Sequence, residues 1–104
     1  MLFIFLLSVA PHSLAASGCP RVPSESSGHY SRALALAEKK DYKDGAPHLR
    51  TAQFLLRYQA PDGAIDDSEL LIGQADFAYS RKLYRKSFNL RKNLYLSTVS
   101  RICK

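Results

Sequence analysis

Apolar residues recur at helical spacing in four stretches of the chain, and this periodicity constrains the fold more than any other feature. None of the four stretches shows the sustained alternation that is typical of a β-strand. Short turns separate the first stretch from the second and the third from the fourth. The sequence therefore predicts an all-α fold in which two antiparallel helical hairpins stack on each other. The four predicted helices begin near His29, Asp44, Asp66 and Leu83.

The predicted helix starts carry residues that favour helix N-termini. Asp44 is a good N-cap for the second helix, and Pro47 falls in its first turn, where backbone amides lack partners in any case. Asp66 and Glu69 have the spacing of a capping box at the start of the third helix. Local chemistry thus agrees with the periodicity.

The two predicted hairpins carry the same small-residue pattern. In each hairpin a small residue of the first helix is followed 12 positions later by a small residue of the second helix, with a tyrosine three positions before the latter. Small side chains allow two helices to approach to about 8–10 Å. The residues are Ala33, Tyr42 and Gly45 in the first hairpin and Ala75, Tyr84 and Ser87 in the second.

This pattern resembles the tetratricopeptide repeat (TPR), a family of helix–turn–helix units, over residues 29–96. The period of 42 residues between the two tyrosines is longer than the roughly 34 residues of that family. The resemblance implies a short TPR-like stack with an inner groove for a protein or peptide. The groove would lie between the first and third helices, with candidate contacts at Tyr30, Leu34, Gln74 and Phe77.

The N-terminus has the pattern of an export signal. Residues 2–9 form an apolar run that is too short to span a bilayer, which needs about 20 apolar residues. Small residues follow at positions 15–18, although no lysine or arginine precedes Arg21. We expect residues 1–18 to be a signal peptide and the protein to be periplasmic, anchored to a membrane as a lipoprotein, or secreted.

The mature chain divides into three predicted parts. Residues 19–28 are rich in proline and serine and are interpreted as a flexible tether. The TPR-like helical domain is expected to span residues 29–99. Residues 100–104 form a predicted C-terminal tail.

Cys19 and Cys103 lie at the two ends of this mature chain, and two alternatives are open for them. Residues 14–19 resemble a bacterial lipobox, in which Cys19 would carry a lipid. Alternatively, both thiols reach an oxidising compartment and form a disulfide. The alternatives exclude each other, because an acylated cysteine has no thiol left to pair. The cysteines and the two histidines, His29 and His48, show no metal-ligand spacing, so we expect no metal site.

Positive charge is concentrated near the C-terminus. The chain holds 15 Lys and Arg against 9 Asp and Glu, and residues 81–104 contain eight of the basic residues and no acidic one. Most of these residues fall opposite the apolar seam of the fourth helix, which makes it a basic amphipathic helix. The candidate binding residues on this face are Arg81, Lys82, Arg85, Lys86 and Lys92.

These observations favour a non-enzymatic module that binds a protein or peptide partner in the cell envelope. Two hairpins make a small core, so an end cap, a disulfide or another chain, which could be a second copy, is expected to cover their exposed faces. An anionic membrane surface is the alternative partner, because each basic residue near such a surface contributes about 1 kcal/mol. Nucleic acid ranks last, since an exported protein rarely meets it.

A catalytic role is disfavoured by the sequence. Four acidic residues, Asp62, Asp66, Asp67 and Glu69, cluster around one loop, but their spacing does not match an EF-hand, and helix capping explains them. No phosphate-binding glycine loop or nucleophile elbow occurs in the sequence. We expect no cofactor, and a small disulfide-stabilised secreted enzyme or effector is the last alternative.

Overall fold

The computed structural model describes residues 19–57 and 68–103, and every regular element within them is an α-helix. The predicted signal peptide and the acidic loop that precedes the third helix lie outside the described residues. The prediction of an all-α fold built from two helical hairpins is confirmed. The first hairpin consists of α2 (Ser24–Glu38) and α3 (Tyr42–Arg57), and the second of α4 (Ser68–Ser80) and α5 (Tyr84–Ile102).

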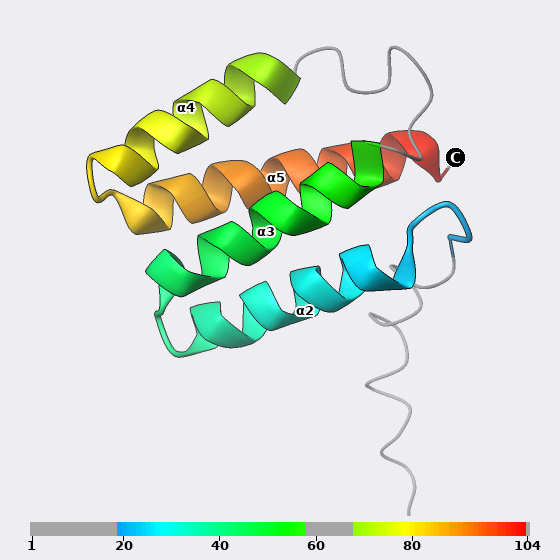
Figure 1. Cartoon of the computed structure of the whole chain (residues 1–104), viewed down its shortest axis with the longest axis horizontal. Coiled ribbons are helices and arrows are strands. Elements are labelled where there is room, and N and C mark those ends of the chain that lie inside the picture. The colour runs from blue at the N-terminus through cyan, green and yellow to red at the C-terminus, as the bar shows by residue number, and fades with distance from the viewer. Residues whose placement is uncertain (1–18, 58–67, 104) are drawn as a thin grey trace, which may run out of the picture.

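The two hairpins dock through their second helices (Figure 1). α3 packs against α2 on one side and against α5 on the other, and α5 packs in turn against α4. α2 and α4 lie on opposite outer sides of this arrangement. α3 and α5 begin at the same end of the molecule, so the turns of the two hairpins are neighbours in space although 42 residues separate them in sequence.

A hydrogen-bonded turn ends α2. Lys40 adopts a positive φ of 61°, and its amide donates to the carbonyl oxygen of Ala37 at 2.8 Å. The next amide, that of Asp41, donates to the carbonyl oxygen of Leu36 at 2.9 Å. These two bonds define a Schellman motif, in which a left-handed residue satisfies the last carbonyl groups of a helix.

The second hairpin repeats this turn residue by residue, 42 positions later. Lys82 has a φ of 64°, its amide donates to Tyr79 at 2.9 Å, and the Leu83 amide donates to Ala78 at 2.8 Å. Glycine is the usual residue in this left-handed conformation. Two lysines at equivalent positions therefore indicate a single turn design that the chain uses twice.

The predicted small-residue crossings are present in both hairpins. A Cβ atom added at Gly45 would lie 3.4 Å from the backbone oxygen of Ala33 and only 2.9 Å from Cε2 of Phe88. In the second hairpin the hydroxyl of Ser87 donates to the carbonyl oxygen of Ala75 at 2.8 Å. All four crossing residues are buried, so each pair of helices approaches closely at the predicted point.

Two groups of buried side chains form the core between the helices. The first group consists of Ala33, Ala46, Leu49 and Phe88. The second group consists of Val22, Ala52, Leu56, Tyr95 and Ile102. Each group, together with the side chains packed against it, contains residues of α2, α3 and α5. The core therefore joins the two hairpins.

The helices extend further than predicted at both ends of the mature chain. α2 begins at Ser24, so the second half of the expected tether is helical. Ser26 explains this difference, because its buried hydroxyl donates to the carbonyl oxygen of Ala52 in α3 at 2.8 Å. α5 continues to Ile102, whose side chain is buried. Residues 100–102 of the expected tail therefore belong to the last helix.

Candidate functional site

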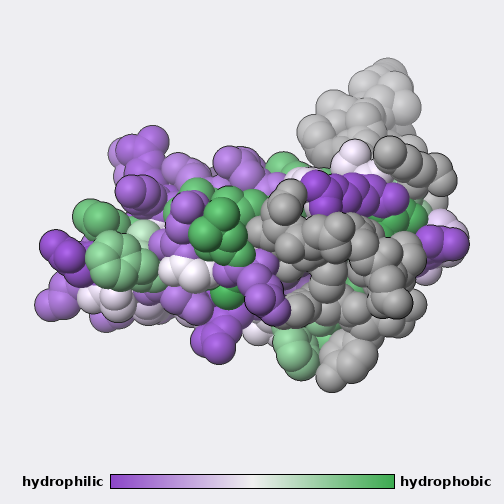
Figure 2. All heavy atoms as spheres, turned by 90° about the horizontal axis from the view of Figure 1, so that it is seen from above, coloured by the Kyte–Doolittle hydropathy of each residue, from purple (hydrophilic) through white to green (hydrophobic). Residues whose placement is uncertain are grey.

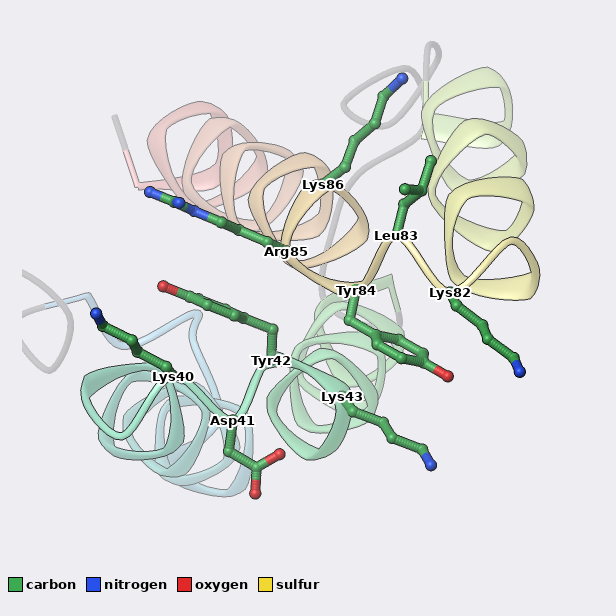
Figure 3. A pocket seen from close by; sticks show the side chains of 9 residues that line it. All are labelled: Lys40, Asp41, Tyr42, Lys43, Lys82, Leu83, Tyr84, Arg85 and Lys86. Atoms are coloured by element: carbon green, nitrogen blue, oxygen red, sulfur yellow. The ribbon is translucent and has the colours of Figure 1, made fainter.

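A pocket opens between the two neighbouring turns (Figure 3). Its volume is about 480 Å³, and both hairpins contribute side chains to its walls. We call it the turn pocket. Its lining residues are Lys40, Asp41, Tyr42, Lys43, Lys82, Leu83, Tyr84, Arg85 and Lys86.

The turn pocket is strongly basic. Five of its nine lining residues are lysine or arginine, and all five are exposed. The one acidic lining residue, Asp41, is already engaged, because its Oδ1 accepts the amide of Asp44 at 3.1 Å and caps the first turn of α3. A concave site with this balance of charge attracts anionic groups.

Two reciprocal cation–π contacts tie the walls of the turn pocket together. Arg85 of the second hairpin lies 5.8 Å from the ring centroid of Tyr42 in the first. Lys43 of the first hairpin lies 5.8 Å from the ring centroid of Tyr84 in the second. Each tyrosine thus contacts the basic residue that directly follows the other tyrosine in the sequence, because Lys43 follows Tyr42 and Arg85 follows Tyr84. The two turns are therefore held in register by equivalent residues, and the pocket depends on both of them.

The start of α5 adds to the positive potential of the turn pocket, whereas Asp44 in the first turn of α3 and the Asp41 cap offset the potential at the start of α3. The first amides of an α-helix carry partial positive charge, and α3 and α5 both start here. The first turn of α5 contains no acidic residue, and Leu83 at its N-cap position makes no side-chain capping hydrogen bond. The backbone dipole of α5 thus reinforces the charges of the side chains.

Apolar side chains lie beside these cations. Seen from the side of α4, the turn end is mostly hydrophilic with hydrophobic residues interspersed (Figure 2). Phe77 and Leu83 are 63% and 50% exposed. The guanidinium carbon of Arg81 lies 5.5 Å from the ring centroid of Phe77. The margin of the pocket therefore offers apolar contact area next to positive charge.

The structure brings together part of the predicted basic face. Lys82, Arg85 and Lys86 line the turn pocket. Arg81 and Lys82 precede α5 and lie in the turn, so they do not belong to its helical face. Lys92 follows Arg85 by about two helical turns along α5 and does not line the pocket.

Sequence reasoning missed the contribution of the first hairpin to this site. The signal was available in the repeat, because three positions that line the pocket carry the same kind of side chain in both turns, 42 residues apart. The equivalent pairs are Lys40 with Lys82, Tyr42 with Tyr84, and Lys43 with Arg85.

The expected groove between the first and third helices is corrected by the structure, because α2 and α4 lie on opposite outer sides. Tyr30 stacks on Tyr95 of α5, with ring centroids 4.5 Å apart, and Leu34 packs against the first group of core residues. Gln74 and Phe77 are exposed on α4. The docking of α5 against α3 separates the two pairs of candidate residues, so they do not form one surface.

The ends of the described chain are joined by a disulfide between Cys19 and Cys103, with Cα atoms 5.7 Å apart. The structure therefore has the disulfide, one of the two alternatives predicted for Cys19. A lipid on Cys19 is incompatible with this bond. Both cysteines pack against the second group of core residues, so the bond ties the start of the first hairpin to the end of the second.

Comparison with protein-family models, with curated proteins and with solved structures finds no match to this chain. Within residues 19–57 and 68–103, no helix has the combination of length and hydropathy that a membrane-spanning segment needs.

Proposed function

We propose that the protein is a non-enzymatic helical module that binds an acidic segment of a partner protein in the turn pocket. The observation that carries this proposal is that five exposed cationic side chains from two hairpins line one open pocket. Carboxylates of a partner would pair with these cations, and Arg85 can bind a carboxylate through two parallel hydrogen bonds. Tyr42 and Tyr84 supply rigid aromatic contact area of the kind that contributes most at interfaces.

An anionic membrane surface is the second candidate partner. The exposed Phe77 and Leu83 lie close to the cations of the turn end, and apolar side chains next to basic ones favour binding to lipid headgroups. The half-buried rings of Tyr42 and Tyr84 nevertheless lie in the walls between the exposed cations, where a peptide that enters the pocket reaches them and a flat bilayer does not. We therefore place the acidic protein segment first.

We further propose that the two hairpins are units of a TPR-like array. The matched Schellman turns and the matched small-residue crossings support a common origin for the two units. The array would differ from the expected one in its docking, which joins α3 to α5. Its two outer helices, α2 and α4, are the faces on which a further hairpin or a second copy would stack.

We also infer that the protein works outside the cytosol. Disulfides persist in oxidising compartments and are rare in reducing ones, and the bond between Cys19 and Cys103 supports an exported chain. Export agrees with the interpretation of residues 1–18 as a signal peptide. The acidic partner would then be a protein of the cell envelope or of the extracellular space.

Fluorescence anisotropy with a short labelled oligoglutamate peptide tests the proposed function. We expect binding that weakens as salt is raised, because exposed charges are screened. The double variant Lys43→Glu with Arg85→Glu reverses one charge of each hairpin at the turn pocket. Its affinity is expected to fall by about tenfold or more, because like charges that face each other at an interface cost several kcal/mol.

The matched control is the double variant Arg21→Glu with Arg32→Glu. It changes the net charge by the same amount, and its two residues are exposed and do not line the turn pocket. An equal loss of affinity in both variants would show that the peptide responds to net charge alone, which would overturn the pocket proposal. Binding to phosphatidylserine vesicles without binding to the peptide would select the membrane surface instead.

A further inference from the structure

Two histidines meet across the first hairpin. The Nδ1 atoms of His29 in α2 and His48 in α3 lie 3.0 Å apart and form a hydrogen bond, and the rings stack with centroids 5.3 Å apart at an interplanar angle of 30°. Both residues are half-buried, so solvent reaches the pair. The fold brings the two rings together, although 19 residues separate them in sequence.

Packing alone does not require histidine at this crossing. The positions 42 residues later, in the second hairpin, hold Leu71 and Leu90, which are also half-buried. The same hairpin geometry therefore accepts two leucines where the first hairpin has two imidazoles. The histidine pair is an addition to the repeat that the needs of the backbone do not explain.

The separation of the two nitrogens suits a shared metal ion. At metal–nitrogen distances of about 2.0–2.1 Å, two nitrogens 3.0 Å apart subtend an angle of roughly 90–97° at the ion. This is the angle between neighbouring ligands in tetragonal and octahedral sites, which Cu²⁺ and Ni²⁺ favour. A tetrahedral Zn²⁺ would require the nitrogens to separate further. Cu²⁺ also binds nitrogen ligands more tightly than the other divalent first-row metals do.

The charged residues one helical turn away leave a net acidic environment. Glu25 and Arg32 flank His29 on α2, and Asp44 precedes His48 by four residues on α3; all three are exposed. Within the described ranges, no group of three or more His, Cys, Asp or Glu side chains could hold an ion. The site would therefore supply two protein ligands and leave its other coordination positions to water or to a donor from another molecule.

We propose that His29 and His48 chelate a divalent late transition-metal ion through their two Nδ1 atoms, and that Cu²⁺ is the ion they bind best. Binding breaks the hydrogen bond between the rings: the proton on one Nδ1 leaves to solvent and that ring keeps or takes up its proton on Nε2, so both Nδ1 lone pairs face the ion. A bound ion would clip α2 to α3 in the first hairpin only, because the second hairpin has leucines at the equivalent positions. This proposal revises the expectation of no metal site, which rested on spacing in sequence. It does not depend on the turn pocket.

Titration of the disulfide-bonded chain with CuCl₂ tests the proposal. We expect one Cu²⁺ per chain and an electron paramagnetic resonance spectrum with nitrogen hyperfine structure from two imidazoles. The double variant His29→Leu with His48→Leu copies the second hairpin and is expected to keep the fold. Even changes outside the ligand set weaken metal sites by about 10–100-fold, so this variant should lose at least about tenfold in affinity.

The variant Gln74→Leu is the matched control, since it replaces an exposed polar side chain of the second hairpin by leucine and leaves the proposed pair intact. Its Cu²⁺ affinity should equal that of the unaltered chain. Equal Cu²⁺ binding by the double leucine variant would overturn the proposal. If that variant does not fold, Cu²⁺ added in substoichiometric amounts to the unaltered protein provides the decision by nitrogen-15 NMR, because this paramagnetic ion broadens the resonances of its ligands. Nδ1 resonances of His29 and His48 that stay sharp would then overturn the proposal, and selective loss of both would support it.

Discussion

The turns of the two hairpins have the same backbone geometry, but the side chains at the helix crossings next to these turns differ. Both hairpins end their first helix with a lysine in the left-handed conformation, Lys40 or Lys82, and both place a small residue five positions later. Gly45 leaves room for the ring of Phe88, whereas Ser87 donates a hydrogen bond to a carbonyl oxygen of α4. The backbone geometry is therefore repeated in the two hairpins, and the side-chain packing is not.

A second contrast lies in the core. Leu49 of the first hairpin is fully buried, and the equivalent residue of the second hairpin is Arg91, which is 5% exposed and paired with Asp76. Burial lowers the pKa of Arg91, and the Asp76 carboxylate opposes that shift. The second hairpin therefore depends on a charge pair where the first depends on apolar packing.

Removal of the disulfide is expected to cause the largest loss of unfolding free energy, because this bond holds the two hairpins together at the end away from the turns. The chain between Cys19 and Cys103 spans 84 positions. The double variant Cys19→Ser with Cys103→Ser should lose about 2–5 kcal/mol of unfolding free energy. Urea denaturation measures this loss, and reduction of the unaltered protein should reproduce it. An unchanged urea midpoint would show that the hairpins hold together without the bond.

Substitution at the two crossings should separate their packing. In Gly45→Leu the new side chain would collide with Phe88, since even a Cβ atom would lie 2.9 Å from its ring, and we expect a loss of about 2–3 kcal/mol. Ser87→Ala removes only the hydrogen bond to Ala75 and should cost about 1 kcal/mol. Urea denaturation of both variants measures the difference. Similar losses of unfolding free energy in the two variants would show that the two crossings are packed alike.

Loss of Asp76 and loss of Arg91, the two partners of the charge pair in the second hairpin, should lower stability by unequal amounts. Asp76→Asn leaves the buried guanidinium of Arg91 without its carboxylate and should cost about 1–3 kcal/mol. Arg91→Leu copies Leu49 of the first hairpin and leaves Asp76 exposed to water, so we expect a change of less than about 1 kcal/mol. Thermal unfolding measures both effects. A larger loss from Arg91→Leu would show that the pair stabilises the second hairpin beyond what apolar packing offers.

Stability is expected to fall at alkaline pH because of the tyrosine stack that joins the hairpins. Burial raises the pKa of Tyr30 and of Tyr95, the proximity of Tyr95 adds to the shift of Tyr30, and the hydrogen bond from Ser26 opposes the shift of Tyr95. A raised pKa means that the folded state holds the phenolic proton more tightly. The contribution of the two protonated tyrosines to stability is fully present below the ordinary pKa of 10.0. It is lost as pH rises through their folded-state pKa. Ultraviolet titration should show these two tyrosines ionising last, and the variant Tyr30→Phe should weaken the alkaline loss.

The smallest effects are expected at the repeated turns. Glycine adopts a positive φ at no steric cost, so Lys40→Gly and Lys82→Gly should each stabilise the fold by about 0.5–1 kcal/mol. The two gains should be equal, because the two turns have the same backbone hydrogen bonds. Lys39→Gly is the control, since Lys39 has a negative φ, and it should not stabilise the fold. A gain at only one of the two turns would break the equivalence of the hairpins.

The features predicted correctly from the sequence depend on local patterns. The helical periodicity, the pairing into hairpins and the crossing of Ala33 with Gly45 all follow from residues close together in the chain. The docking of α5 on α3 could not be predicted in this way, because an amphipathic helix with an apolar stripe does not specify which helix will cover it. The groove prediction failed for this reason.

Long-range contacts explain the other differences. Ser26 belongs to a segment whose proline and serine content suggests a tether, but its hydrogen bond to Ala52 in α3 makes the segment helical. The basic residues of the second turn were identified, whereas Lys40 and Lys43 were not, because only the fold places the first turn beside the second. The pairing of the two histidines depends on the same kind of contact.

We propose that both hairpin turns together form one site for an acidic segment. Proton–nitrogen correlation spectra of the labelled protein, recorded as the oligoglutamate peptide is added, test whether the two turns bind as one. We predict that amide resonances of residues 40–43 and of residues 82–86 shift together along a single binding curve. Shifts confined to one of these turns, or centred on Lys92 and the rest of α5, would contradict a shared pocket.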